Sequence, residues 1–349
     1  MKKDDLLSRP LEHISLEDVK PIEMIDRMKL MAFQARNLAR AAEIYEAMVK
    51  DKLCGIILCL AGSLISAGLK KVIVEMVDNN MVDAIVSTGA NIVDQDFFEG
   101  LGYKHYSGCA DVDDNLLREL HIYRIYDTYI DEDQLRICDD TMRRLFDSLP
   151  PRPYASWEVI RKMGEHLESS KCQAESIVLS CYRKNVPVFC PAFSDSSAGF
   201  GILHHQWKAA REGRGHVSID NVKDFFDLIR VKALSGTTGL LVIGGGVPKN
   251  FAQDIVAAAE ILEYEIEAHK YLVQITVADE RDGGVSGSKL REANSWIQID
   301  QGLDQMVFGE ATVMFPLLAG YAYHKKAYKG RPEKNFILEL EKPFVKINK

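Results

Sequence analysis

The sequence predicts an α/β fold built around a mostly parallel sheet. Short, uninterrupted apolar runs recur along the chain, and each leads into a Gly- or Ser-containing turn followed by helical apolar spacing. Strands that alternate with helices in this way form parallel sheets, because each helix returns the chain to the same edge. With 349 residues and 47% hydrophobic side chains, the chain can bury a large core, as one large domain or two smaller ones.

Composition narrows the classes of partner. The formal net charge of −8 argues against nucleic acid, whose phosphates need clustered Lys and Arg, and suits a cationic substrate such as an amine. Seven scattered cysteines without a CxxC pair predict reduced thiols in a cytoplasmic protein, with no metal site. The uncharged stretch 53–69 is interrupted by glycine and serine, so we expect a strand, a turn and a helix start there. We expect no membrane partner.

The N-terminal region is expected to be an irregular arm followed by one long helix. Residues 1–22 lack a regular pattern, whereas residues 22–50 place apolar side chains on one stripe of an amphipathic helix. We assign 1–50 to this arm and helix and 51–330 to the sheet-containing domain. The charged, proline-containing segment 331–349 is expected to be a solvated tail.

Two turns at expected strand ends lie in the first half of that domain. The apolar run 54–60 leads into the turn AGSLISAG, and the run 82–87 leads into Thr88-Gly89-Ala90-Asn91. In open parallel sheets, ligands gather at the carboxyl ends of the strands. Both turns are therefore candidate ligand-binding segments.

The middle of the chain contains a further strand and a polar loop. Residues 123–130 are expected to form an exposed extension, residues 131–148 a charged helix, and the PPRPY stretch at 150–154 a break within one domain. The apolar run 186–190 is the next strand. Asp195 follows it, either as a hydrogen-bonding carboxylate of a ligand site or as the cap of the next helix.

The stretch from Gly239 to Glu260 is the most informative in the chain. An apolar run at 240–243 predicts a strand buried on both faces, and three glycines follow it. Pro248 is tolerated in a first helical turn, and helical apolar spacing continues beyond it. A strand, a glycine turn and a helix N-terminus together can bind an anion, often the phosphates of a nucleotide, although a tight turn without a ligand has the same pattern. Beyond it we expect a strand over 271–277, a polar loop, and an apolar helix over 311–323.

Several collinear segments resemble deoxyhypusine synthase and its bacterial relatives over about residues 50–325. They are AGSLISAG (61–68), VDAIVSTGA (82–90), VPVFCPAFSD (186–195) with GGGVPKN (244–250), GGVSGSKLREANSW (283–296) and GEATVMFPLL (309–318). The resemblance implies a doubly wound, Rossmann-like sheet with helices on both faces. It also implies a homotetramer that holds NAD and a polyamine such as spermidine between subunits. In that family an aminobutyl group is held as an imine on a lysine before transfer.

The resemblance keeps most of the residues expected to hold the cofactor and part of the substrate site. On the NAD side the matching residues are Ser63, Ser66, Thr88, Gly89, Asp195, Gly245, Gly246 and, where the family has aspartate, Glu310. Ser286 also matches, and we expect it to contact the substrate. Glu292 and Trp296 match as a carboxylate and an indole face for an ammonium group.

The positions expected to carry the chemistry depart from the family. Gln298 replaces the imine-forming lysine, Gln95 a glutamate proposed as a base, and Asn250 a histidine. An amide nitrogen cannot act as the nucleophile. Val285 and Phe200 replace acidic residues. Lys249 and Lys289 lie nearby and could substitute for the lysine, but we expect both to be solvated surface side chains.

These departures predict a function related to, but different from, deoxyhypusine synthesis. We expect NAD-dependent transfer of an aminoalkyl group from a polyamine of the spermidine or putrescine type to a small amine or an unidentified acceptor. The alternative is a catalytically inactive member that binds NAD or another metabolite and acts in regulation or assembly.

Overall fold

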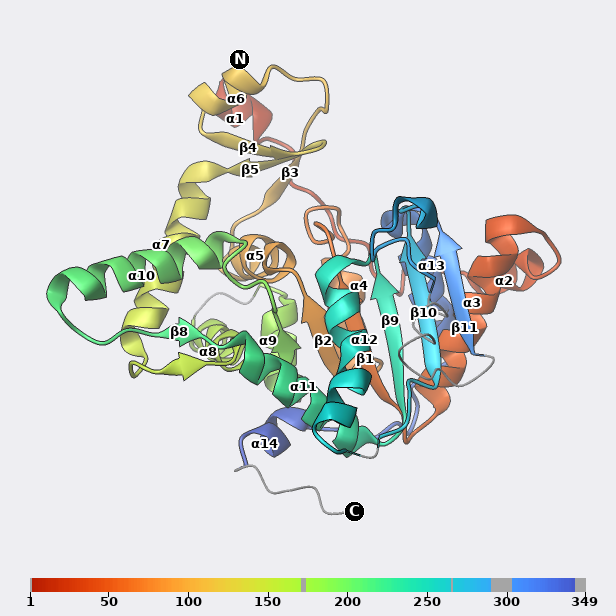
Figure 1. The fold of residues 1–349 in the computed structure, drawn as a ribbon. Helices are drawn as coiled ribbons and strands as arrows, with labels where there is room; N and C mark the ends of the chain where they lie inside the picture. Colours follow the sequence, from red (N-terminus) through yellow and green to blue (C-terminus); the bar gives the residue numbers. More distant parts are fainter. Residues whose placement is uncertain (1, 171–173, 265, 290–302, 343–349) are drawn as a thin grey trace.

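The computed structural model describes residues 2–170, 174–264, 266–289 and 303–342. A six-stranded parallel sheet forms the centre, with strand order β11-β10-β9-β1-β2-β7 (Figure 1). Its strands are β1 (Gly55–Leu60), β2 (Ala84–Ser87), β7 (Val188–Phe189), β9 (Thr238–Ile243), β10 (Tyr271–Thr276) and β11 (Asp304–Phe308). The predicted α/β fold with a mostly parallel sheet is confirmed.

The chain winds outward from β1 in both directions, as a doubly wound sheet does. It first builds β2 and β7 on one side of β1, and then β9, β10 and β11 on the other. Every residue of β1 and β9 is buried, which explains why their sequences are uninterrupted apolar runs rather than alternating ones. The reversal of strand order lies between β1 and β9, where such sheets open a crevice at the strand ends.

Helices cover both faces of the sheet (Figure 1). Alternate residues of β1 point to opposite faces: Ile56 and Leu58 join one core cluster, and Ile57 and Cys59 join the other. The first cluster includes apolar residues of α3, α4 and α13, and the second includes those of α11, α12 and α14. The helices are α4 (Lys70–Asp78), α5 (Phe98–Gly100), α7 (Glu132–Ser148), α8 (Ser156–Ser169), α9 (Ile177–Lys184), α10 (Ser197–Glu212), α11 (Asn221–Ser235), α12 (Gly246–Ile261), α13 (Ala311–His324) and α14 (Phe336–Leu340).

Residues 22–50 form two helices, so the prediction of one helix over this range is wrong. They are α2 (Ile22–Met28) and α3 (Phe33–Lys50). Phe33 has a φ of 54°, a left-handed backbone conformation that cannot continue an α-helix. Lys29 bridges the break, because its Nζ lies 2.8 Å from Asp26 and 2.7 Å from Glu43 on α3.

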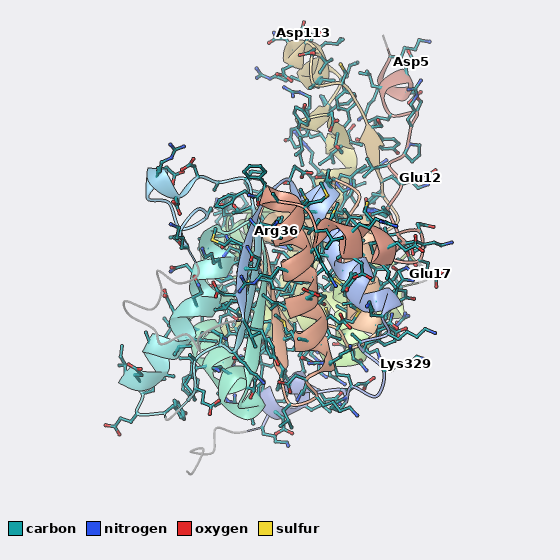
Figure 2. The ribbon with its side chains drawn as sticks, turned by 90° about the vertical axis from the view of Figure 1, so that its right-hand side faces the viewer. Asp5, Glu12, Glu17, Arg36, Asp113 and Lys329 are labelled. Atoms are coloured by element: carbon teal, nitrogen blue, oxygen red, sulfur yellow. The ribbon has the colours of Figure 1, made fainter. Side chains whose placement is uncertain are left out.

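A small antiparallel sheet stands apart from the main body, and it corrects the prediction that 123–130 is an exposed extension. Strands β3 (His105–Ser107), β5 (Thr128–Asp131) and β4 (Ile122–Ile125) form it in that order. Tyr129 is buried, and its hydroxyl donates to the Cys109 carbonyl. The helices α1 (Lys3–Leu6) and α6 (Asp114–Glu119) lie beside it, and Figure 2 shows Asp5 and Asp113 at its far end.

The described part of the expected C-terminal tail is packed rather than solvated. The Arg331 guanidinium is buried and donates to both carboxylate oxygens of Asp83 and to the Cys54 carbonyl. Phe336, Ile337 and Leu340 of α14 are also buried in the core cluster with α11 and α12. The prediction of a solvated tail rested on the charged and proline-containing composition and overlooked this short apolar segment.

Two further strands, β6 (Pro153–Tyr154) and β8 (Ser218–Ile219), pair as a small parallel ladder. The PPRPY stretch is therefore part of a structured connection between α7 and α8. Over the described ranges, no helix is both long and apolar enough to cross a membrane.

Candidate cofactor and amine site at the strand ends

The turns that follow β1 and β9 meet at the reversal of strand order. The Ala61 amide donates to the Ile243 carbonyl at 3.0 Å, and a Cβ added to Gly244 would lie 3.0 Å from the Ala61 Cβ. The Thr88 amide, after β2, donates to the Leu60 carbonyl at 3.1 Å. The predicted strand-end turns are thus neighbours in space, as the parallel arrangement requires.

The three glycines after β9 have distinct structural reasons. Gly244 and Gly246 have φ values of 85° and 57°, in the left-handed region that favours glycine. Gly245 is extended, but a Cβ there would lie 2.5 Å from the Cα of Ser286, so a side chain would displace backbone. The turn is therefore packed tightly against the 283–288 loop.

Ser286 completes the N-terminus of α12. The Gly246 amide donates to its Oγ at 2.9 Å, so this hydroxyl satisfies one of the amides that a helix N-terminus leaves unpaired. Ser286 was expected to contact the substrate. Its Oγ instead holds the turn, which leaves the substrate role an open prediction.

Lys249 is fully buried, so the expectation of a solvated surface lysine is wrong for this residue. Its Nζ donates to the carbonyls of Val285 at 2.9 Å and Ser288 at 2.7 Å, and to the Ser288 Oγ at 3.0 Å. Gln274 of β10 adds two bonds from its Nε2, to the carbonyls of Gly244 and Ser286. These donors fasten the 283–288 loop over the glycine turn. The other lysine, Lys289, is 64% exposed and pairs with Glu280, as expected of a surface side chain.

A short π-helix, η1 (Ala90–Phe97), organises the turns after β1 and β2. Asn91 accepts a bond from the Leu64 amide at 2.7 Å and donates to the Thr88 hydroxyl at 3.1 Å. Gln95 is also buried, and its Oε1 accepts from the Ser66 amide at 2.8 Å. π-helical segments are frequent at functional sites because they re-aim side chains within a helix.

Gln95 therefore acts in this structure as a support for the first turn. Its carbonyl oxygen is occupied by the Ser66 amide, while its Nε2 is buried without a hydrogen-bond partner among the described residues. An amide has no basic lone pair comparable to a carboxylate, so Gln95 cannot remove a proton as a glutamate would. Ser66, expected on the NAD side, is buried, and its hydroxyl donates to the Ser63 carbonyl.

Two partly or largely buried carboxyl groups, Asp94 of η1 and Asp139 of α7, interact with Ser197, which follows the loop after β7. Asp94 of η1 accepts a bond from the Ser197 amide at 2.6 Å, and burial raises the pKa of Asp94 to about 7. Burial also raises the pKa of Asp139 on α7 to about 6. A buried carboxyl is harder to ionise because it leaves water, and like charges nearby add to the shift.

Asp195 lies in this loop with an exposed side chain. Helix α10 has no side-chain cap from Ser196 or Asp195, and the Asp94 carboxylate bonds its first amide instead. The alternative that Asp195 caps the helix is therefore wrong. Gly89 is fixed by the same loop, since a Cβ there would lie 2.5 Å from the Ser196 Oγ.

Glu310 follows β11 at the far end of the same edge. It is exposed, and its carboxylate accepts from the amide and hydroxyl of Thr312, so it caps helix α13. If Glu310 also bound a cofactor, the same carboxylate would have to contact the cofactor and cap the helix.

A mainly apolar cavity of about 550 Å³ opens beside the glycine turn. Its lining residues are Asn221, Val222, Phe225, Gly246, Val247, Asn250, Phe251, Asp254 and Val285. The Phe225 and Phe251 rings lie 4.8 Å apart between centroids. Asp254 supplies the only carboxylate of this lining, accepts a bond from the Asn250 amide at 2.7 Å, and has its pKa raised by burial.

The cavity brings together two of the positions that depart from the family pattern. Asn250 and Val285 both line it, whereas Phe200 is an exposed residue of α10 outside this lining. Gln298, Glu292 and Trp296 lie outside the described residues. Within the described ranges, no group of three or more His, Cys, Asp or Glu side chains could hold a metal ion.

Three residues of this site have roles that the sequence analysis did not assign. Asn91 is the last residue of the predicted Thr88–Asn91 turn, but its bonds to Leu64 and Thr88 were not foreseen. Lys249 lies within the glycine motif but resembles a surface lysine. Asp254 is one helical turn beyond Asn250, and only the packing of α11 against α12 makes it a cavity residue.

Comparison with known proteins decides the family. The family model described as deoxyhypusine synthase matches residues 23–322. The chain belongs to the deoxyhypusine synthase family. It is 59% identical over 342 residues to a deoxyhypusine synthase-like protein of Chlorobaculum parvum, covering 98% of this chain and 97% of that one.

More distant members agree. A deoxyhypusine synthase-like protein of Coxiella burnetii is 50% identical over 337 residues, with 96% of this chain and 94% of that protein covered. A solved structure from Entamoeba histolytica, described by the same family name, superposes with a TM-score of 0.60 at 18% identity. It covers 90% of this chain and 97% of that chain, and it supports the fold.

Proposed function

We propose that this family member transfers an aminoalkyl group from a polyamine to a small amine or another acceptor in an NAD-dependent reaction. The observation that carries the proposal is the apolar cavity with one carboxylate, Asp254, directly beside a glycine turn at the strand reversal. A polyamine needs an apolar channel for its methylene groups and a carboxylate for an ammonium group.

The residues at the strand reversal fit a dinucleotide. The Gly244–Gly246 turn opens α12, where backbone amides and the helix dipole favour a pyrophosphate. The hydroxyls of Ser63 and Thr88 line the neighbouring turns, and the exposed carboxylates of Asp195 and Glu310 suit ribose hydroxyls. Gln95 and Gln274 each retain a buried amide atom without a partner among the described residues. NAD, when bound, supplies the hydride acceptor.

The chain's own residues define what the amine would meet. Asp254 would hold one ammonium group, and the faces of Phe225 and Phe251 would pack on the methylene chain. Glu292 and Trp296 remain predicted contacts for a second cationic centre. A carboxylate and an aromatic face both stabilise positive charge that develops next to nitrogen during oxidation.

Strict deoxyhypusine synthesis is disfavoured by three substitutions. Gln298 cannot form an imine, and neither Val285 nor Phe200 can pair with an ammonium group. Burying an ammonium without its carboxylate partner costs several kcal/mol. We therefore infer that a small amine attacks any imine directly, expels the amine fragment of the donor and forms a new imine, to which the hydride would return. No bond to the enzyme is then needed.

A second candidate is a non-catalytic member that binds NAD. The specific observation in its favour is Gln95. Its Oε1 accepts a bond from the Ser66 amide, and an amide side chain cannot act as a general base at this position. This candidate shares the NAD site with the first and differs in predicting no turnover.

The deciding experiment is mass analysis of the products formed by purified protein with NAD and a panel of diamines and triamines. New polyamines would support transfer, whereas saturable NAD binding with unchanged amines would support the second candidate. Glu292→Gln and Trp296→Leu should each weaken amine binding or turnover by on the order of 1–3 kcal/mol and leave NAD affinity near the wild-type value. Wild-type behaviour of both variants toward every amine would remove these two residues from the site.

A further inference from the structure

A second cavity, of about 650 Å³, lies on the flank formed by α7 and α8. Figure 1 shows these helices toward the β2 end of the sheet, away from β11 at the other edge. The lining residues are Thr141, Arg144, Leu145, Ser148, Leu149, Pro150, Arg152, Tyr154, Lys162, Glu165, His166 and Ser169. None of them belongs to the strand-end turns or to the cavity beside the glycine turn.

The lining is cationic. Arg144, Arg152 and Lys162 contribute three positive charges against the single carboxylate of Glu165. Glu165 pairs with Lys162 at 2.6 Å, and carboxylates outside the lining pair with the two arginines, Asp140 with Arg144 and Glu158 with Arg152. What the lining offers an anion is therefore the guanidinium N–H groups that these pairs leave unused. A cationic lining is unusual for a chain with a formal net charge of −8, because its average surface repels anions.

Arg152 is held in place before any ligand arrives. The Arg152 Cζ lies 3.6 Å from the centroid of the Tyr154 ring, so the guanidinium stacks on it. The guanidinium also donates to the Pro153 carbonyl and pairs with Glu158 at 2.9 Å. Tyr154 is buried, and its hydroxyl donates to the Pro150 carbonyl. A preorganised guanidinium loses less conformational entropy on binding than a free one.

Arg144 faces the same space from α7. Its Nη2 donates to the Thr141 hydroxyl at 2.9 Å, and its Nη1 lies 3.3 Å from Asp140, a carboxylate that Arg143 shares. The side chains of Arg144 and Arg152 are 60% and 49% exposed, so both retain N–H groups for a ligand. Five donors on each guanidinium exceed the contacts already made.

Hydroxyl groups and an apolar wall complete the lining. The hydroxyls of Thr141, Ser148 and Ser169 line the cavity and donate to backbone carbonyls of their own helices, so the anion donors are the guanidinium groups. Leu145, Leu149 and Pro150 provide apolar surface. The volume falls within the range of small-molecule pockets. Guanidinium pairs bind phosphate and carboxylate oxygens in a bidentate fashion, which gives selectivity for planar or tetrahedral oxyanions.

We propose that this basic cavity between α7, α8 and the 149–155 connection binds a small organic polyanion, a phosphate ester or a multiply charged carboxylate. The guanidinium groups of Arg144 and Arg152 hold the anionic groups, and the apolar wall holds the remainder of the ligand. The site is separate from the proposed NAD and amine site and does not depend on it.

Isothermal titration calorimetry at fixed ionic strength tests this, with pyrophosphate as the phosphate probe and citrate as the carboxylate probe. Saturable binding of either, with a dissociation constant below about 1 mM, supports the site and identifies the preferred chemistry. Binding should weaken at least tenfold in the Arg144→Gln/Arg152→Gln double variant and remain unchanged in Arg281→Gln, which removes an equivalent exposed charge elsewhere.

Two further variants keep the result interpretable. Arg144→Gln/Lys162→Gln leaves the Arg152–Tyr154 stack intact and should also bind the probes more weakly. It serves as the test if the first double variant does not fold. Gly245→Ala alters the glycine turn, and unchanged pyrophosphate binding there would separate this cavity from the NAD site. Absence of saturable binding, or equal binding by wild type and both double variants, would overturn the proposal.

Discussion

The two sides of the strand reversal hold their turns by opposite chemistry. On the β1, β2 and β7 side, side-chain oxygens of η1 accept bonds from backbone amides: Asn91 from Leu64, Gln95 from Ser66, and Asp94 from Ser197. On the β9 and β10 side, most of these bonds run the other way: Lys249 and Gln274 donate to backbone carbonyls, although the Ser286 hydroxyl accepts from the Gly246 amide.

This difference separates a side that includes a buried carboxyl group from one that is held by a buried lysine and an amide. The acceptor side includes the Asp94 carboxyl, whose pKa is about 7, whereas the donor side depends on a buried lysine and on close backbone packing. We expect mutations on the donor side to cost the most stability and mutations on the acceptor side to be smaller and, at Asp94, dependent on pH.

The largest effect is expected for Lys249→Met. The substitution removes a fully buried ammonium group that donates to two carbonyls and one hydroxyl, so the free energy of unfolding should fall by about 3 kcal/mol. Lys289→Met in the same loop removes an exposed ammonium group and should cost less than about 0.5 kcal/mol. Chemical denaturation of both variants tests the pair, and equal losses would contradict the structural role of Lys249.

Gly245→Ala should follow, with a loss of about 2 kcal/mol and NAD binding weakened more than tenfold, because the added Cβ collides with the backbone of Ser286. Gly284→Ala is the matched control, since its Cβ would approach the flexible end of the Asp282 side chain. Thermal unfolding and NAD titration measure both effects. Wild-type NAD affinity of the Gly245→Ala protein would show that the glycine turn does not take part in cofactor binding.

Gln95→Met tests the acceptor side and should cost about 1–2 kcal/mol, because the buried Ser66 amide loses its partner. Gln34→Met is its control: the Gln34 amide also accepts a backbone bond, from Phe308 at 2.8 Å, but in an exposed position where water can replace it. Denaturation midpoints that rank the two variants in the reverse order would show that the π-helix does not support the first turn.

The smallest effect is expected for Asp94→Asn, and it depends on pH. Because burial raises the folded-state pKa of Asp94, its stabilising contribution is present below the ordinary carboxyl pKa and is lost as pH rises through about 7. The asparagine variant keeps the acceptor for Ser197 and cannot ionise. Between about pH 5 and about pH 7 its stability relative to wild type should rise by on the order of 1 kcal/mol, after allowance for partial access of water. Unfolding free energies of both proteins across this range check the slope, and parallel curves would contradict it.

The sequence predicted the sheet because buried parallel strands are continuous apolar runs, as at 240–243. It also located the glycine turn and the Thr88–Gly89 turn, where glycine is required by backbone geometry. The break before Phe33 was missed because the apolar stripe continues across it.

The bonds that fix the site were not predictable, because they join distant residues: 27 positions separate Leu64 from Asn91, and 40 separate Gly246 from Ser286. Burial of Lys249 likewise depends on the later 283–288 loop. Local sequence patterns carry no signal for such pairings.

The central claim is that an amine is oxidised at the strand reversal, and isotope transfer tests it most directly. Purified protein is incubated with NAD and with putrescine or spermidine deuterated at the carbons next to nitrogen, the reaction is quenched within the first turnover, before the hydride returns, and the reduced nicotinamide cofactor is examined by mass spectrometry. We predict that deuterium enters the cofactor with wild-type protein and is reduced at least tenfold with Gly245→Ala. Saturable NAD binding without any deuterium transfer from either amine would contradict the claim and leave the non-catalytic function in its place.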